Sequence, residues 1–345
     1  MPAADSNIDA VYSVLAGKFR RYHGEGWRQF VHLPTLALNI RDSFYVLVGL
    51  AQSYHLLRTL KPDALFVKGG FVGVPVGLAA AVLRIPYVTH DSDAIPGLAN
   101  RIIARWAVRH TVALPAELYP YSAAKTTSVG IPLTPNFKPV TPKLQNQFRG
   151  AIGVPLSNKL LFIIGGGLGA QRINTAIAQI LPHLLAEFTN LSVVHGVGRA
   201  NKALVAAAYD ADLSPTMRRR VIVKGFIDDL YRYSGAADVI VTRAGATNLA
   251  EFSVQGKACI VVPSPFLAGG HQLKNAQVLQ ASGAVVVVAE TDMQADPNFL
   301  ARAISDLLKN DARVAELGRQ FQSLAHHDSA RQVAELLITE TRHEK

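Results

Sequence analysis

The chain has 345 residues, of which 49% are hydrophobic, and its formal net charge is +10. This length favours two domains, while the single cysteine excludes a disulfide framework and a cysteine zinc site. The longest uncharged apolar stretch, 69–83, is too short to span a membrane, and the first residues lack the order of a signal peptide. We therefore expect a cytoplasmic protein in which Cys259, lying in an apolar run, packs in the core.

Short apolar runs alternate with helical patterns along the chain. Strands are predicted at 64–68, 86–90, 111–115, 159–164, 191–196, 221–225, 238–242, 258–263 and 284–290. Helices are predicted at 74–83, 96–110, from 169 onward, and at 229–237, 246–256, 271–283, 297–309, 311–325 and 328–341. Repeated strand–helix units with buried strands predict parallel sheets that carry helices on both faces.

The stretch 130–150 interrupts this alternation, because it contains four prolines and little periodicity. We therefore predict an α/β protein with two Rossmann-like, doubly wound domains and a cleft between them. The expected parts are an N-terminal domain at 1–135, a linker at 136–150, a C-terminal domain at 151–325 and a C-terminal helix at 326–345. Ligands of such sheets bind beyond the carboxyl ends of the strands, so functional residues should follow strands.

Positive charge is concentrated in the first domain. Residues 1–150 contain 16 Lys and Arg against 8 Asp and Glu, whereas residues 151–345 contain 19 against 17. This asymmetry indicates an anionic partner, such as a phosphorylated substrate or a membrane surface, or else ordinary solubilising charge. No nucleic-acid-binding motif occurs, and we expect no nucleic-acid partner.

Three loops of the second domain follow predicted strands. "GGGLGAQ" (165–171) leads into a predicted helix. Its glycines allow a ligand to approach the backbone closely, and the free N–H groups at the helix start favour a phosphate, although many such turns only connect a strand to a helix. "TRAGATNLAE" (242–251) repeats this arrangement, and its Glu251 is either a ligand for a ribose diol or a solvated helix residue. In "PSPFLAGGHQLKNA" (263–276), the polar residues are either caps or suited to sugar hydroxyl groups.

In the first domain, "KGGFVGVP" (68–75) and "HDSDAIPGLANR" (90–101) follow strands. A histidine at such a place is usually structural. Because His90 stands next to two acids, it is also a candidate for proton transfer.

Taken in order, these loops resemble the bacterial MurG family of N-acetylglucosaminyltransferases. The resemblance is carried by "VKGGFVGVPVGLAA", "IPYVTHDSDAIPGLANR", "FIIGGGLGAQRIN", "GFIDDLYRYSGAADVIVTRAGATNLAE" and "GGHQLKNAQVLQASGAVVVV", and it covers most of residues 10–325. It implies a GT-B fold and inverting transfer of N-acetylglucosamine from UDP-N-acetylglucosamine to the C4 hydroxyl of lipid I. The product is lipid II, for peptidoglycan synthesis, cell shape and cell division, and no cofactor or metal ion is implied.

The resemblance also implies residue roles. Phe226 and Ile227 would hold the uracil, and Glu251 the ribose. The remaining donor-binding residues would be Gly166, Gly167, Leu168, Ala244, Gly245, Ala246, Thr247, His271, Gln272 and Asn275. His90 and Asp91 would be catalytic, with Gly69, Gly70 and Asp93 on the acceptor side. Lys18, Arg20 and Arg21 would face anionic lipid at the cytoplasmic face of the inner membrane, where the protein would be peripheral.

This sequence departs from the family pattern at three points. Asp93 and Thr134 stand where members usually have Asn and Arg. The Gly-Gly-Thr-Gly-Gly-His loop that begins the family is absent, and a late start codon, a second chain or lost activity would explain this absence. Asp91-Ser92-Asp93 also resembles the metal-binding Asp-x-Asp of another glycosyltransferase fold, but the fold pattern here is different.

Other functions stay open. The same second domain would serve a glycosyltransferase acting on another lipid, such as diacylglycerol, or a donor-binding subunit that is inactive without a partner. A nicotinamide dehydrogenase is disfavoured, because no acid ends the strand that follows the glycine turn.

Overall fold

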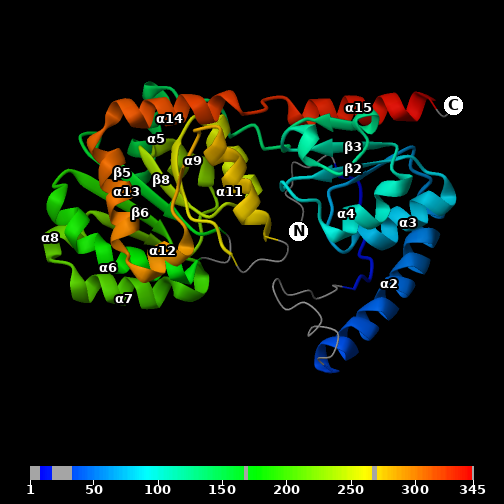
Figure 1. Cartoon of the computed structure of the whole chain (residues 1–345), viewed down its shortest axis with the longest axis horizontal. Coiled ribbons are helices and arrows are strands. Elements are labelled where there is room, and N and C mark those ends of the chain that lie inside the picture. The colour runs from blue at the N-terminus through cyan, green and yellow to red at the C-terminus, as the bar shows by residue number, and fades with distance from the viewer. Residues whose placement is uncertain (1–7, 18–32, 167–169, 266–269, 344–345) are drawn as a thin grey trace. The chain divides into compact units, whose positions relative to one another are not determined.

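The computed structural model describes residues 8–17, 33–166, 170–265 and 270–343. The chain divides into two compact units (Figure 1). Unit 1 comprises residues 1–128 and 331–345, and unit 2 comprises residues 129–330. Each unit contains one parallel sheet covered by helices, which confirms the predicted two-domain α/β class.

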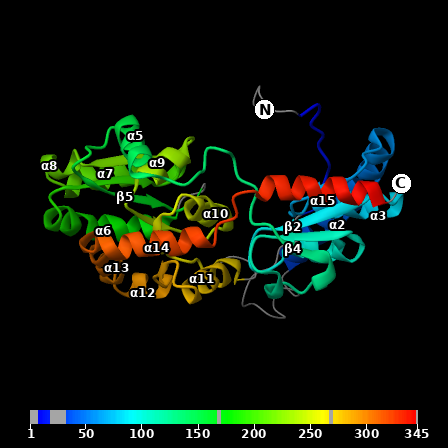
Figure 2. The same ribbon diagram turned by 90° about the horizontal axis from the view of Figure 1, so that it is seen from above.

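Unit 1 is built on a four-stranded parallel sheet in the order β1-β2-β3-β4. Its strands are β1 (Leu65–Val67), β2 (Tyr87–Asp91), β3 (Arg109–Val112) and β4 (Thr126–Ser128). Its helices are α2 (Leu33–Leu60), α3 (Gly73–Leu83), α4 (Leu98–Ile103) and α15 (Ser329–His343), with short 3-10 turns η1 (Ala104–Trp106), η2 (Ala116–Leu118) and η3 (Ala123–Lys125). Figure 1 and Figure 2 both show α15 running along this sheet, where Glu340 forms an ion pair with Arg109 of β3 (2.7 Å).

Every residue of β2 is buried, and small residues allow the helices to pack closely around the sheet. A side chain at Gly77 of α3 would lie only 3.0 Å from Ile103, and the Tyr87 hydroxyl donates to the Ile103 carbonyl at 2.6 Å. The carboxyl end of β2, with His90 and Asp91, is therefore held in a rigid core.

Unit 2 has a six-stranded parallel sheet in the order β10-β9-β8-β5-β6-β7. Its strands are β5 (Lys159–Ile164), β6 (Leu191–Gly196), β7 (Val221–Lys224), β8 (Val239–Thr242), β9 (Ala258–Val261) and β10 (Val286–Val287). Its helices are α5 (Pro142–Ile152), α6 (Gln171–Glu187), α7 (Lys202–Asp212), α8 (Pro215–Arg218), α9 (Leu230–Ala236), α10 (Ala246–Val254), α11 (His271–Ala281), α12 (Glu290–Ala295), α13 (Asn298–Lys309) and α14 (Asp311–Ser323), with the 3-10 turn η4 (Arg199–Asn201). The chain reverses direction across the sheet between β5 and β8, which makes this pair the topological switch point.

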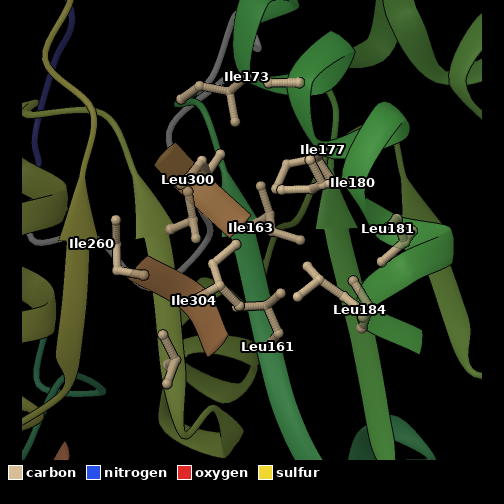
Figure 3. Close-up of a cluster of buried hydrophobic side chains, with 14 of the residues drawn as sticks. Leu161, Ile163, Ile173, Ile177, Ile180, Leu181, Leu184, Ile260, Leu300 and Ile304 are labelled. Carbon is tan, nitrogen blue, oxygen red and sulfur yellow. The ribbon is translucent and has the colours of Figure 1, made fainter. Parts of the chain in front are cut away.

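Two apolar cores sandwich this sheet. Figure 3 shows one of them, where Leu161 and Ile163 of β5 face the apolar side of α6 and residues Leu300 and Ile304 of α13. On the other face, Phe162 of β5 packs with residues of α10, α11 and α14. Alternate residues of β5 thus fill opposite cores, as expected for a central parallel strand.

Several predicted elements need correction. The helix predicted at 96–110 ends at Trp106, because β3 already begins at Arg109. Within the stretch expected to be a linker, Pro142–Ile152 forms α5, where Thr141 accepts a hydrogen bond from the Leu144 N–H and Pro142 occupies the first turn. The last strand has only two residues.

No element was predicted at 33–60, where the structure has the 28-residue helix α2. Its burial reverses the usual pattern, since Asp42 and Ser53 are buried while Phe44 and Leu47 are more than 60% exposed. Among the described residues, no helix is both long and apolar enough to cross a bilayer.

Candidate functional site

Because all strands of unit 2 are parallel, the loops that follow them lie at one edge of the sheet. The predicted donor-binding residues of the second domain lie in these loops and on the helices that follow them. Gly167 and Leu168 lie outside the described residues, as do Lys18, Arg20 and Arg21 near the start of the chain.

The turn after β5 requires glycine. A side chain at Gly165 would place its Cβ 2.4 Å from the Ala170 Cβ and 2.5 Å from the Ala170 nitrogen, and Gly166 has a φ of +91°. The helix α6 that follows has no side-chain cap. Its first N–H groups and the positive end of its dipole are therefore suited to an anion.

The turn after β8 also leads into a helix without a side-chain cap. Gly245 is the N-cap of α10 without a side-chain cap, and a Cβ at this position would meet no atom within 4 Å. Ala244 is buried, and its carbonyl accepts a hydrogen bond from the Asn275 amide nitrogen of α11 (3.0 Å). Two uncapped helix starts thus follow β5 and β8, the two strands of the switch point.

Helix α11 is fixed to its surroundings through two of the residues predicted to read the sugar. The Gln272 side-chain oxygen accepts from the Ser264 N–H at 2.9 Å. Asn275 is only 3% exposed, so its contact with Ala244 positions the β8 turn. His271 begins the same helix, and Glu251 is half-buried on α10.

The loop after β7 carries Phe226, which is 45% exposed, and Ile227, whose side chain packs against Gly196 at the end of β6. The Arg199 guanidinium lies over the Phe226 ring, 4.3 Å from its centroid. Arg199 lies in the loop after β6, for which no role was predicted from the sequence. Gly198 (φ +88°), two residues after the end of β6, is a signal that could have marked this loop.

A buried polar chain supports the same edge. His195 contacts the Tyr209 hydroxyl through Nδ1 (2.8 Å) and the Asn174 side-chain oxygen through Nε2 (3.1 Å). The Asn174 amide nitrogen donates to the Val197 carbonyl at 3.0 Å. Burial lowers the pKa of His195 to about 3, so this histidine is neutral and fixes β6 to α6 and α7.

In unit 1, His90 is fully buried. Its Nδ1 lies 3.1 Å from the Thr111 hydroxyl, while its Nε2 has no hydrogen-bond partner within the described part of the chain. Burial, with a smaller effect of the Lys68 charge, lowers the pKa of His90 to about 4. The ring is therefore neutral at pH 7.

Asp91 is 4% exposed and accepts hydrogen bonds from the Asn100 amide (2.9 Å), the Tyr121 hydroxyl (2.8 Å) and the Gly97 backbone. Burial raises the pKa of the Asp91 carboxyl, and these hydrogen bonds oppose the shift. The Asn100 amide also donates to the His90 carbonyl at 2.8 Å, so one side chain holds both candidate catalytic residues.

The predicted acceptor-side glycines adjoin this group. Gly69 and Gly70 both have positive φ, and a Cβ at Gly69 would lie 3.4 Å from the Asn100 side chain. The Asp93 carbonyl accepts from the Tyr119 hydroxyl at 3.0 Å. In the described ranges, no group of three His, Cys, Asp or Glu side chains is arranged to hold a metal ion.

Comparisons with known proteins find both domains of one family in this chain. The glycosyltransferase family 28 C-terminal domain matches residues 160–333, and the family's N-terminal domain matches residues 31–112. The UDP-N-acetylglucosamine–N-acetylmuramyl-(pentapeptide) pyrophosphoryl-undecaprenol N-acetylglucosamine transferase of Citrifermentans bemidjiense is 32% identical over 294 residues, which is 85% of this chain and 78% of that protein. The protein of the same name from Salinibacter ruber is 34% identical over 299 residues, covering 87% and 77%.

The solved structures give the same result. MurG of Acinetobacter baumannii superimposes with a TM-score of 0.67 at 26% identity, over 86% of this chain and 79% of that one. S. aureus MnaA with UDP has a TM-score of 0.61 at 13% identity, over 85% and 80%, and shows likeness of fold alone. With both family domains matched in order, the chain belongs to glycosyltransferase family 28 as a MurG-like UDP-N-acetylglucosamine transferase.

Proposed function

We propose that the chain transfers N-acetylglucosamine from UDP-N-acetylglucosamine to the C4 hydroxyl of lipid I, forming lipid II with inversion at the anomeric carbon. The observation that carries this proposal is the pair of uncapped helix starts, α6 and α10, at the switch point of unit 2. The relatives' names supply the acceptor.

The donor would lie along the strand-end edge of unit 2. The diphosphate accepts from backbone N–H groups at the starts of α6 and α10, which include Gly166 and residues 244–247. These dipoles stabilise the charge that develops on UDP as it leaves. The uracil contacts the backbone of Phe226 and Ile227, and Glu251 binds the ribose. Gln272, whose oxygen is already engaged by Ser264, offers its amide nitrogen to the sugar, with His271 beside it.

A base must remove the proton of the attacking hydroxyl, and we keep His90 and Asp91 as the candidates. Asp91 is favoured, since burial raises its pKa and strengthens it as a base. His90 is neutral at pH 7, but its pKa of about 4 makes it a weak base. An Asp91→Asn enzyme should lose turnover by about 10²–10⁴-fold. Unchanged turnover in His90→Ala would remove His90 as a base, and unchanged turnover in Asp91→Asn would remove Asp91.

Unit 1 would contact the anionic cytoplasmic face of the inner membrane as a peripheral protein. In support, residues 1–128 of this unit carry a net charge of +5 (13 minus 8), and Val11, Phe44 and Leu47 expose more than 60% of their surface. Each of Lys18, Arg20 and Arg21 would contribute about 1 kcal/mol. Replacing the three by Glu should abolish sedimentation with phosphatidylglycerol vesicles and leave activity on a soluble lipid I analogue intact.

The decisive experiment offers the chain UDP-N-acetylglucosamine and a short-chain lipid I analogue, and follows UDP release and the disaccharide product. Glu251→Gln should raise the KM for the donor, whereas Glu316→Gln, on the exposed face of α14, is a matched control that should not. If the chain forms product with diacylglycerol but not with the lipid I analogue, then diacylglycerol replaces lipid I as the acceptor. UDP binding without any transfer would favour a donor-binding subunit.

A further inference from the structure

Glu290 is a buried acid that lies between two arginines in unit 2. It is the first residue of α12, and its side chain is 1% exposed. One carboxylate oxygen forms an ion pair with Arg172, and the other forms an ion pair with Arg243. Arg243, which is 11% exposed, also donates to the Val262 carbonyl at 3.1 Å.

The two arginines belong to the two turns of the switch point. Arg172 is the second residue of α6, directly after the turn that follows β5. Arg243 directly follows β8 and precedes the turn that starts α10. Glu290 itself follows β10, at the far end of the sheet order. A single carboxylate therefore connects the starts of α6 and α10 from outside both turns.

The charges of this group make the connection firm. Two guanidinium groups share one carboxylate that is almost fully buried, and its contact with the nearly buried Arg243 acts in a medium of low dielectric constant. Without the carboxylate, Arg243 would keep its charge in a site that is almost closed to water. Arg172 is 39% exposed and could turn into solvent.

We propose that Glu290 is a positioning residue for the donor diphosphate. It holds Arg172 and Arg243 away from the phosphate path and fixes the spacing between the N-terminal ends of α6 and α10. This inference rests on the proposed donor site and adds to it a residue that does not touch the donor. A misplacement of about 1 Å in the bound substrate can cost about 10²-fold in the rate of catalysis, so this spacing matters.

The test compares UDP with uridine, because uridine lacks the diphosphate. The dissociation constants of both are measured by calorimetry on the full chain and on Glu290→Gln, which keeps the shape of the side chain and removes its charge. We expect UDP to bind at least tenfold more weakly to the variant, with uridine changed less than about twofold. A merely structural role would weaken both ligands alike.

Two further variants keep the test decisive. Arg172→Ala removes one contact at a partly exposed position, so it tests the proposal even if Glu290→Gln does not fold. It should give a smaller loss of affinity, again for UDP and not for uridine. Asp238→Asn is the matched control. Asp238 forms an ion pair with Arg149 (2.5 Å) at the opposite, strand-start edge of the same sheet. Its loss should lower stability and leave the ratio of UDP to uridine affinity unchanged.

Three outcomes would overturn the inference. Equal weakening of UDP and uridine, or no weakening, would reduce Glu290 to a fold contact. Tighter UDP binding would mean that Glu290 competes with the diphosphate for the arginines. A parent chain that binds neither ligand would overturn the proposed donor site itself, and this inference with it.

Discussion

Replacing Tyr121 by Phe should destabilise unit 1 by about 1.5–3 kcal/mol at pH 7. The substitution removes a single oxygen, which donates a 2.8 Å hydrogen bond to the buried Asp91 carboxyl group. A hydrogen bond to the charged form of this group contributes about this much. The ring stays, and so does its stacking on His110, at 4.1 Å between centroids. The loss is therefore attributable to the hydroxyl.

The loss should depend on pH. Because the Tyr121 hydroxyl lowers the pKa of Asp91, removing it raises that pKa further. In the folded variant, Asp91 then keeps its proton to higher pH than in the folded parent. The difference in stability between the two proteins therefore grows as pH rises from the Asp91 pKa of the folded parent to that of the folded variant. Toward the ordinary aspartate pKa of 3.8, where Asp91 becomes protonated in both proteins, the difference should shrink.

Urea unfolding followed by tryptophan fluorescence measures this difference, because Trp106 lies in unit 1 and residues 129–330 contain no tryptophan. Tyr119→Phe is the control, since the Tyr119 hydroxyl donates to a neutral carbonyl, that of Asp93. It should cost about 0.5–1.5 kcal/mol at every pH. A Tyr121→Phe penalty below about 0.5 kcal/mol, or one that is equal at pH 7 and pH 4.5, would refute the reasoning.

Three other changes have defined outcomes. Gly165→Ala should abolish UDP binding measured by calorimetry, because its Cβ would lie 2.4 Å from Ala170; retained affinity would show that the turn can widen. Leu161→Ala, in the core of Figure 3, should lower the free energy of unfolding of unit 2 by about 2–5 kcal/mol in urea, and a loss under 1 kcal/mol would indicate a core that collapses. Burial lowers the pKa of Lys257 to about 7, so the unfolded chain binds this proton between pH 7 and the ordinary value of 10.5 and stability should rise with pH there. In Lys257→Met, thermal unfolding should show a smaller rise of stability with pH over this range. An unchanged rise would mean that a group other than Lys257 causes it.

Sequence alone determined the α/β class, most of the strands, and the glycine turns on which the proposed donor site rests. Buried parallel strands appear as continuous apolar runs, and a glycine turn before a helix is a local signal, so both can be recognised without knowing the neighbours. The two-domain organisation follows from the same alternation. The helix α2 was missed for the converse reason, since its exposed Phe44 and buried Asp42 invert the pattern on which such predictions rest.

Only the tertiary structure decided which side chains meet. Arg172 and Glu290 lie 118 positions apart, and Asn174 reaches His195 across 21, so no local pattern could pair them. The sequence marked His90 as a candidate base, but its full burial and low pKa come from the packing of β2 between its neighbours. Likewise, the sequence marked Asn275 as a candidate sugar ligand, and only the fold shows that its amide nitrogen donates to the Ala244 carbonyl. Periodicity fixes which elements form, whereas the desolvation and partners of a polar side chain depend on residues that the fold brings from elsewhere.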